Sequence, residues 1–112
     1  MAAQLSALQK DYATLGDSSR FIEVLEEEPR LFALLIEAAR PLRAAFGERA
    51  ALQLRAQYSD DDRLLKVGVR LPADFGADPE QALRSFDAQW WLKNCHRSGG
   101  ALVFDYEIQD AV

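Results

Sequence analysis

The chain has 112 residues, of which 49% are hydrophobic and 28% are charged, a composition typical of one globular domain. A formal net charge of −5 argues against a phosphate-binding surface, so a nucleic-acid partner is not expected. The single cysteine cannot form an intramolecular disulfide and fits a reducing compartment. We find no signal peptide and no apolar run long enough for a membrane helix, so the sequence predicts a cytoplasmic protein with no membrane contact.

The first segment of the chain has the apolar spacing of a helix. Its large apolar residues recur at intervals of three or four positions: Leu5, Leu8, Tyr12 and Leu15. The sequence therefore predicts an amphipathic helix over residues 2–15, ended by Gly16. We treat residues 1–17 as a loosely attached N-terminal helix and residues 18–112 as a single α+β domain. The apolar stripe can dock on this domain or on a second copy of the chain, which would make a dimer.

Two further helices are predicted before the first strand. Aspartate and serine residues can cap a short helix over roughly residues 19–28, and Pro29 suits the first turn of the next helix. That helix has a clear apolar face and runs to Phe46, where Gly47 ends it. Pro41 lies inside the pattern, so it should kink the helix or split off a last turn.

Two stretches of alternating apolar and polar residues predict an antiparallel hairpin. The first stretch runs from Leu52 to Tyr58 and the second from Leu65 to Leu71, with an acidic loop between them. One face of the hairpin is apolar and belongs to the core. The other face points to solvent and carries the intervening residues: Gln53, Arg55, Gln57, Lys66, Gly68 and Arg70.

The clearest helix start lies at Asp78, a capping residue that is followed by proline in the first turn. The helix that follows contains the adjacent tryptophans Trp90 and Trp91, which cannot both face one core from a regular helix. Either this helix is buried on most sides or it breaks near Asp87, and we favour a bend there. A bend that turns both rings inward lets both pack. Without it, one ring is partly exposed and suited to an interaction.

A last strand over residues 101–108 completes the predicted fold. We expect a two-layer α+β domain with N-terminal helices and a three-stranded antiparallel sheet. The predicted strand order is 2-1-3, with one helix between strands 2 and 3, because a right-handed crossover would bring the third strand beside the first.

This order predicts how charges are arranged on the outer face of the sheet. Arg55 should lie in the middle, with Lys66 and Arg70 on one side and Asp105 and Glu107 on the other. Opposite charges on neighbouring strands stabilise a sheet modestly, so a solvated mosaic is one interpretation. The alternative is that this face, or a free edge of the second or third strand, receives another chain.

No group of residues has the signature of catalysis or metal binding. Cys95 and His96 are the only cysteine and histidine, and neighbours on a helix point about 100° apart, too far for a nucleophile and its base. The acidic run at residues 60–62 can attract a hard cation, but it lacks the spacing of a calcium loop and is typical of a soluble turn. We therefore predict no catalytic residue, no cofactor and no bound metal.

The last third of the chain resembles a group of small uncharacterised bacterial proteins. The pattern is F-D-x-x-W-W-L, then R-x-x-G-x-L and D-x-E, carried here by Phe86, Asp87, Trp90, Trp91, Leu92, Arg97, Gly100, Leu102, Asp105 and Glu107. The group has no assigned activity, so the resemblance implies no catalytic or binding residue. Its members look like accessory proteins encoded beside another small protein, which implies a protein partner and a role of the antitoxin kind.

These observations favour a protein–protein interaction module over an enzyme. The interaction candidates come from the tandem tryptophans and the outer sheet face: Trp90, Trp91, Arg55, Lys66, Arg70, Asp105 and Glu107. One alternative is a small-ligand or enzymatic site between Trp90, Tyr106 and the polar sheet face. Another is an RNA-binding surface in which Tyr58 joins the three basic residues of that face.

Overall fold

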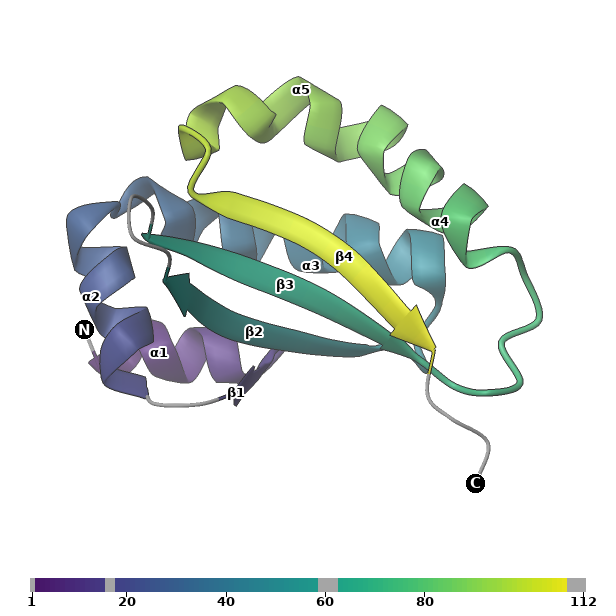
Figure 1. The fold of residues 1–112 in the computed structure, drawn as a ribbon, viewed down its shortest axis with the longest axis horizontal. Helices are drawn as coiled ribbons and strands as arrows, with labels where there is room; N and C mark the ends of the chain where they lie inside the picture. Colours follow the sequence, from purple (N-terminus) through teal and green to yellow (C-terminus); the bar gives the residue numbers. More distant parts are fainter. Residues whose placement is uncertain (1, 16–17, 59–62, 109–112) are drawn as a thin grey trace.

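A computed structural model describes residues 2–15, 18–58 and 63–108 of the chain (Figure 1). Along the chain, these residues form α1 (Ala2–Gln9), β1 (Ala13–Leu15), α2 (Ser18–Glu27), α3 (Arg30–Phe46), β2 (Ala51–Tyr58), β3 (Arg63–Leu71), α4 (Pro79–Phe86), a π-helical turn (Asp87–Trp91), α5 (Leu92–Asn94), a 3₁₀ turn (Cys95–Ser98) and β4 (Leu102–Ile108). Most of these elements were predicted from the sequence, and β1 was not.

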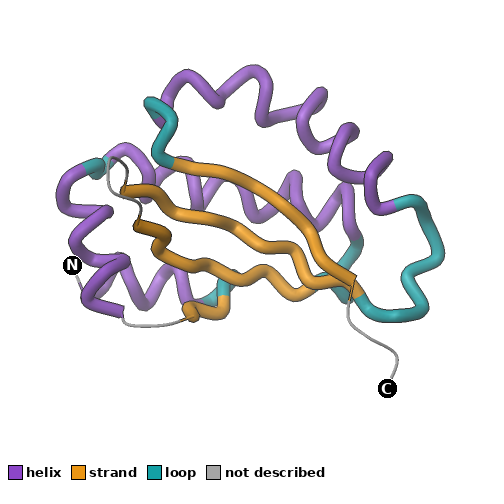
Figure 2. The backbone as a smooth tube through the Cα atoms, viewed as in Figure 1, coloured by secondary structure: helices purple, strands orange, loops and turns teal. Residues whose placement is uncertain are grey.

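The strands form a mixed sheet in the order β1-β2-β3-β4 (Figure 2). β2 and β3 are the predicted antiparallel hairpin, whereas β1 runs parallel to β2 and β4 runs parallel to β3. Each parallel pair is joined by a helical connection, because the chain must cross the sheet to return in the same direction. In Figure 1 the strands lie in front of α3, and the segment from α4 to α5 arches along β4. The α+β class is therefore confirmed.

The predicted three-stranded antiparallel sheet of order 2-1-3 is wrong in strand number, order and direction. The third predicted strand, β4, was expected beside β2 and instead lies beside β3. The position beside β2 is occupied by β1, whose Thr14 is paired with Leu54. The hairpin offers two edges to a crossing strand, and the N-terminal segment fills one of them. As a result β3, and not β2, runs through the middle of the charged outer face.

The N-terminal segment leaves the helical path earlier than its apolar spacing predicts. α1 ends at Gln9, and residues 13–15 are extended, so a helix over residues 2–15 is wrong. Tyr12 lies between the two elements, where its buried hydroxyl donates a 2.6 Å hydrogen bond to the backbone carbonyl of Leu35 in α3. Burial raises the pKa of this phenol. The domain boundary predicted at residue 17 lies outside the described residues.

α3 stays a single helix of 17 residues although Pro41 lies inside it, so it is not split. Proline removes one N–H from the ladder, but the bonds on either side continue the helix to Phe46. As predicted, Gly47 ends it, with a φ of 93° and an N–H that donates to the carbonyl of Arg43 at 2.8 Å.

The core lies between the sheet and the helices. It is built from one face of each of α1 to α4 and the inward residues of the strands, and its largest fully buried side chains include Tyr12, Phe21, Phe86, Leu34, Leu42, Leu54 and Leu65. Fully buried side chains of this size contribute roughly 1.5–3 kcal/mol each relative to an exposed position. The outward residues of β2, β3 and β4 take no part in this core.

Gly99 is a position where alanine should be costly. Its φ of 59° is left-handed, and a methyl group there would lie 2.5 Å from the Nη2 atom of Arg30. We expect Gly99→Ala to lower the free energy of unfolding by about 1–2 kcal/mol, the cost of a left-handed conformation for an L-residue. Gly76→Ala is the matched control, because Gly76 has no positive φ and no atom near the added methyl group. Equal urea midpoints for the two variants would contradict this expectation.

Candidate functional site

The adjacent tryptophans lie on a π-helical turn, Asp87–Trp91, which continues directly from α4. The N–H of Leu92 bonds to the carbonyl of Asp87, five residues back, so this turn is wider than an α-helical turn. The predicted irregularity near Asp87 is therefore present, but it is a change of helix type and not a break. Partial burial and the nearby charge of Glu80 raise the pKa of the Asp87 carboxyl.

The wide turn lets both tryptophan rings reach the same aromatic cluster. Trp90 and Trp91 are stacked with ring centroids 5.9 Å apart, and both are half-buried. Each ring also contacts Phe104 of β4, at 6.4 Å from Trp90 and 4.7 Å from Trp91. Phe86 completes the cluster at 4.9 Å from Phe104. The two tryptophans thus fasten the α4–α5 segment to β4, on the helix side of the sheet.

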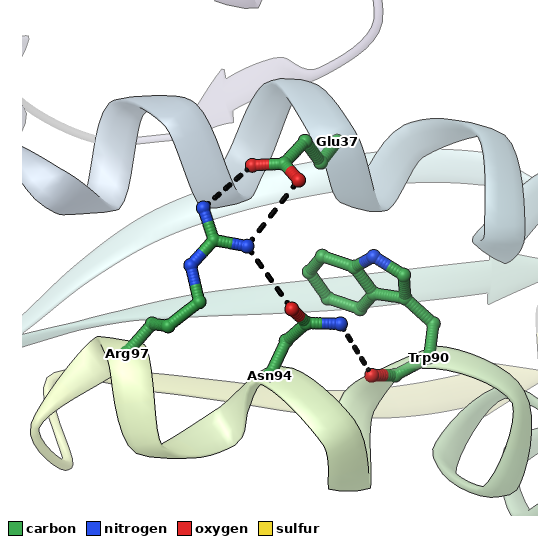
Figure 3. A network of polar contacts seen from close by, with 4 residues as sticks. All are labelled: Glu37, Trp90, Asn94 and Arg97. Atoms are coloured by element: carbon green, nitrogen blue, oxygen red, sulfur yellow. Dashed lines mark hydrogen bonds and ion pairs between the residues drawn. The ribbon is translucent and has the colours of Figure 1, made fainter.

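A polar network holds the end of this segment against α3 (Figure 3). The Arg97 guanidinium donates two hydrogen bonds to the Glu37 carboxylate, at 2.8 and 3.3 Å, and a third to the side-chain oxygen of Asn94 at 3.0 Å. The Asn94 amide in turn donates to the Trp90 carbonyl at 2.8 Å. The bonds from Arg97 lower the pKa of the Glu37 carboxyl and raise the pKa of Arg97. This arrangement ties the end of the helical segment to α3 and fixes the backbone at Trp90.

The outer face of the sheet carries the other predicted interaction residues, in a different order from the one expected. Lys66 and Arg70 of β3 lie in the middle, not Arg55. Lys66 is 3.7 Å from Asp105, and Arg70 is 3.9 Å from Glu107. The acidic residues of β4 therefore neutralise these two basic residues of β3. Such exposed pairs stabilise a fold by about 1 kcal/mol at most. Their main effect is to leave Arg55 on β2 without an ion-pair partner among the described residues.

A hollow of about 100 Å³ lies in the middle of this face, above Gly68 of β3. Its lining residues in the described part of the chain come from β2, β3 and β4: Gln53, Arg55, Lys66, Gly68, Asp105, Tyr106 and Glu107. Gly68 is directly opposite Gln53 on one side and Asp105 on the other. A Cβ atom at Gly68 would meet no atom within 4 Å, so the missing side chain creates the hollow. Glycine inside a strand often marks a place where another group approaches closely.

The charges beside the hollow are not arranged for stability alone. Arg55 and Lys66 are direct cross-strand partners, and like charges in that position destabilise a sheet. Lys66 is partly compensated by Asp105, whereas no acidic side chain among residues 2–15, 18–58 and 63–108 forms an ion pair with Arg55. The strand also loses stability at Gly68, because glycine in a strand interior costs roughly 0.5–1 kcal/mol relative to alanine. Two unfavourable choices lie next to each other beside an open hollow, which makes this face the candidate surface.

The free edge of β4 is a poorer docking site than the outer face. The carbonyl of Ala101 bonds to the N–H of Leu65, so alternate residues from Ala101 onward bond to β3. The N–H of Tyr106 therefore points to the free edge, where the Asp105 side chain accepts a hydrogen bond from it at 2.8 Å. Charged side chains that occupy edge groups protect a sheet against pairing with another strand.

The structure separates the components of the predicted small-ligand site. Trp90 lies in the aromatic cluster on the helix side, whereas the charged residues lie on the opposite face. The ring of Tyr106 also turns to the helix side, where its hydroxyl donates to the Glu80 carboxylate at 3.0 Å. This hydrogen bond raises the pKa of the Tyr106 phenol. Trp90, the Tyr106 hydroxyl and the polar face therefore do not converge on one pocket.

A second, wider depression of about 430 Å³ lies between the end of α1 and α3. Its charged lining residues are Asp11, Arg40, Arg43 and Glu48, two of each sign, and Arg43 already donates to the backbone carbonyl of Asp11 at 3.4 Å. The depression carries no functional assignment.

The residues considered for metal binding or nucleophilic chemistry do not form a site. Cys95 is half-buried with its Sγ 3.8 Å from the Leu92 carbonyl, and His96 is exposed. Within residues 2–15, 18–58 and 63–108, no three His, Cys, Asp or Glu side chains gather in a way that could hold a metal ion. The acidic run at residues 60–62 lies outside the described residues. Over the same described ranges, no helix has the length and apolarity needed to cross a membrane.

Gly68 and Gln53 are the residues of this surface that were not singled out from the sequence. Both were placed correctly on the outward face, but neither was named as a candidate. The sequence did contain a signal for Gly68. This glycine lies between two outward charged residues, in a strand that is otherwise rich in residues that favour β-structure. Gln53 becomes notable only once its register opposite Gly68 is known.

Comparisons with known proteins give no assignment. No protein-family model, no curated protein and no solved structure matches the chain. The resemblance in its last third therefore stays a prediction, and the function has to be argued from the geometry of the chain itself.

Proposed function

We propose that this protein is an interaction module that binds a partner protein through the outer face of its sheet. The observation that carries the proposal is the hollow above Gly68, which is lined by Arg55, a residue without an ion-pair partner in the described part of the chain, and by its like-charged neighbour Lys66. In the view of Figure 1, no described helix passes in front of the strands that form this face. The face is therefore accessible to another macromolecule.

The size of the hollow favours a protein partner over a small metabolite. Pockets for small molecules and cofactors usually enclose about 300–1,000 Å³ and bury most of the ligand. The hollow has about 100 Å³ and is open to solvent. A space of this size accommodates one side chain from a flat protein surface, with the surrounding charges setting the register of the contact. For the same reason an enzymatic function is not proposed.

The same charges argue against an RNA-binding role for this face. An electrostatic site for nucleic acid needs a continuous set of basic groups. Here Asp105 and Glu107 lie 3.7 and 3.9 Å from two of the three basic side chains and neutralise them. An accessory role beside a partner protein, of the kind that the sequence resemblance implies, requires only a surface such as this one.

The proposal is tested by quantitative affinity capture from the cells that produce the protein. The tagged chain, the variant Arg55→Asp and the control Arg84→Asp are compared by mass spectrometry. Arg84 is a matched control because it is an exposed arginine on α4, away from the outer face. We expect a stoichiometric partner with the parent chain and with Arg84→Asp, reduced at least about tenfold with Arg55→Asp, as for loss of a close charge pair.

Two results would contradict the proposal. One is repeated recovery of the protein without a stoichiometric partner at native abundance. The other is a partner whose recovery falls equally with both variants, because the contact would then not lie on the outer face. Far-UV circular dichroism of each variant shows that the fold is intact before the capture is compared.

A further inference from the structure

We infer that the hollow above Gly68 is a socket for the carboxylate of an aspartate or glutamate side chain on the partner protein. This inference rests on the proposed function and names the chemical group that the face recognises. The occupant is a single acidic side chain, held between Arg55 and Lys66 and covered from below by the bare backbone of Gly68.

The balance of charge on the face selects an anion. The lining of the hollow holds two cations, Arg55 and Lys66, and two anions, Asp105 and Glu107, and Arg70 beside it gives the face one positive charge in excess. The two acidic side chains are already engaged by Lys66 and Arg70. A basic side chain in the hollow would compete with these pairs and leave Arg55 unpaired. A carboxylate instead supplies the partner that Arg55 lacks.

The position of the cations suits one carboxylate. Arg55 and Lys66 are directly opposite each other on neighbouring strands, so their Cβ atoms are about 5 Å apart. One carboxylate above this pair can accept hydrogen bonds from both side chains and remove their mutual repulsion. The amide of Gln53, which also lines the hollow, adds a neutral donor.

The charge of the whole chain limits how acidic the partner can be. The formal net charge is −5, so an extended acidic surface would be repelled on approach. The occupant is therefore one carboxylate on an otherwise neutral or basic surface. The local excess of positive charge then fixes how the two proteins align. The negative net charge of the chain disfavours strongly acidic proteins as competitors.

The inference is tested on the isolated full-length protein by an NMR titration. The ¹⁵N-labelled chain is titrated with a blocked pentapeptide, Gly-Ser-Glu-Ser-Gly, and with versions that carry Gln or Lys in the middle. We expect shifts of the Gly68 and Arg55 amides with the Glu peptide, at about a tenfold lower half-saturation concentration than with the Gln peptide, the ratio expected for one charge-assisted contact. The Lys peptide should give no saturable shift there.

Variants separate binding in the hollow from general charge attraction. Gly68→Val places a side chain in the hollow, where an added Cβ atom meets no atom within 4 Å, and Arg55→Gln leaves the hollow open but removes the charge of Arg55. Both should abolish the preference for the Glu peptide, whereas Arg84→Gln should retain it. Equal binding of the three peptides, or no shift at Gly68, would overturn the socket. A dimer of the parent chain that dissociates in Arg55→Gln would assign the carboxylate to a second copy and overturn a separate partner.

The titration and the capture experiment can fail independently. The titration contains no partner protein. Its failure would therefore contradict the carboxylate site, but not the binding of a partner to the outer face. Recovery of the parent chain without a stoichiometric partner, together with a specific Glu-peptide shift, would contradict the interaction module and leave an anion site.

Discussion

Replacing Phe86 by alanine is expected to lower the free energy of unfolding by about 3–5 kcal/mol, the usual cost of removing a buried aromatic ring. Phe86 is completely buried at the end of α4. Its ring contacts Phe104 at 4.9 Å and Trp90 at 5.7 Å, so it joins the sheet to the π-helical turn. The loss would be a large fraction of the 5–15 kcal/mol that stabilises a typical domain.

The matched control is Leu92→Ala, one turn further along the same helical segment. Leu92 is 66% exposed, so its truncation should change stability by no more than about 0.5 kcal/mol. Urea unfolding followed by far-UV circular dichroism measures both variants without relying on tryptophan fluorescence. A loss below about 1 kcal/mol for Phe86→Ala, or equal losses for the two variants, would contradict the role of the aromatic cluster in holding α4 to the sheet.

The sequence predicted those parts of the fold that depend on local patterns. The β2–β3 hairpin follows from strict alternation of apolar and polar residues, and the start of α4 follows from Asp78, whose side chain accepts a hydrogen bond from the N–H of Glu80 at 3.1 Å. The end of α3 at Gly47 is likewise local. Each of these signals extends over a few residues, so these elements can be predicted without knowing how the chain packs.

The order of the strands could not be predicted because it depends on competition for an edge. β1 has three residues, too few for a periodic signal, and it follows a stretch whose Leu8 and Tyr12 have helical spacing. Both of these residues are buried in the structure. The spacing therefore predicted which side chains are buried, but it did not predict that the helix ends at Gln9. Once β1 pairs with β2, only the β3 edge remains for β4.

The charged residues of the candidate surface were predicted from the sequence, but their arrangement on the sheet was not. Alternation placed Arg55, Lys66 and Asp105 on the outward face, and the exposed positions agree with this. Their pairing depends on strand order, so the unpaired state of Arg55 appeared only with the structure. The hollow depends on an absent side chain at Gly68, a feature that hydrophobic periodicity does not record.

For the adjacent tryptophans, the geometry of a regular helix indicated correctly that both rings could not face one core, but it did not predict the conformation that solves this. Trp90 and Trp91 were recognised as incompatible with one face of a regular helix. The structure resolves this conflict with a π-helical turn at Asp87–Trp91, where the rings stack on each other and both reach Phe104. A π-turn has no strong sequence signature, because it is stabilised by the packing that it allows.

Replacing Gly68 by valine is expected to increase stability and remove partner binding at the same time. A Cβ atom added at this position meets no atom within 4 Å, and valine is a far better strand former than glycine. We expect the free energy of unfolding to rise by about 1 kcal/mol. The same side chain occupies the hollow, so recovery of the partner should fall at least about tenfold. Opposite changes in stability and binding are typical of a position kept for function.

The most direct measurement is therefore the paired stability and partner recovery of Gly68→Val, with Gly76→Val as the matched control. Gly76 also has no positive φ and no atom near an added Cβ, but it lies in the loop before α4, away from the outer face. If the partner binds the outer face, Gly68→Val should have a higher urea midpoint and lose the partner, whereas Gly76→Val should recover the partner fully. A stabilised Gly68→Val variant that still binds its partner like the parent chain would contradict it.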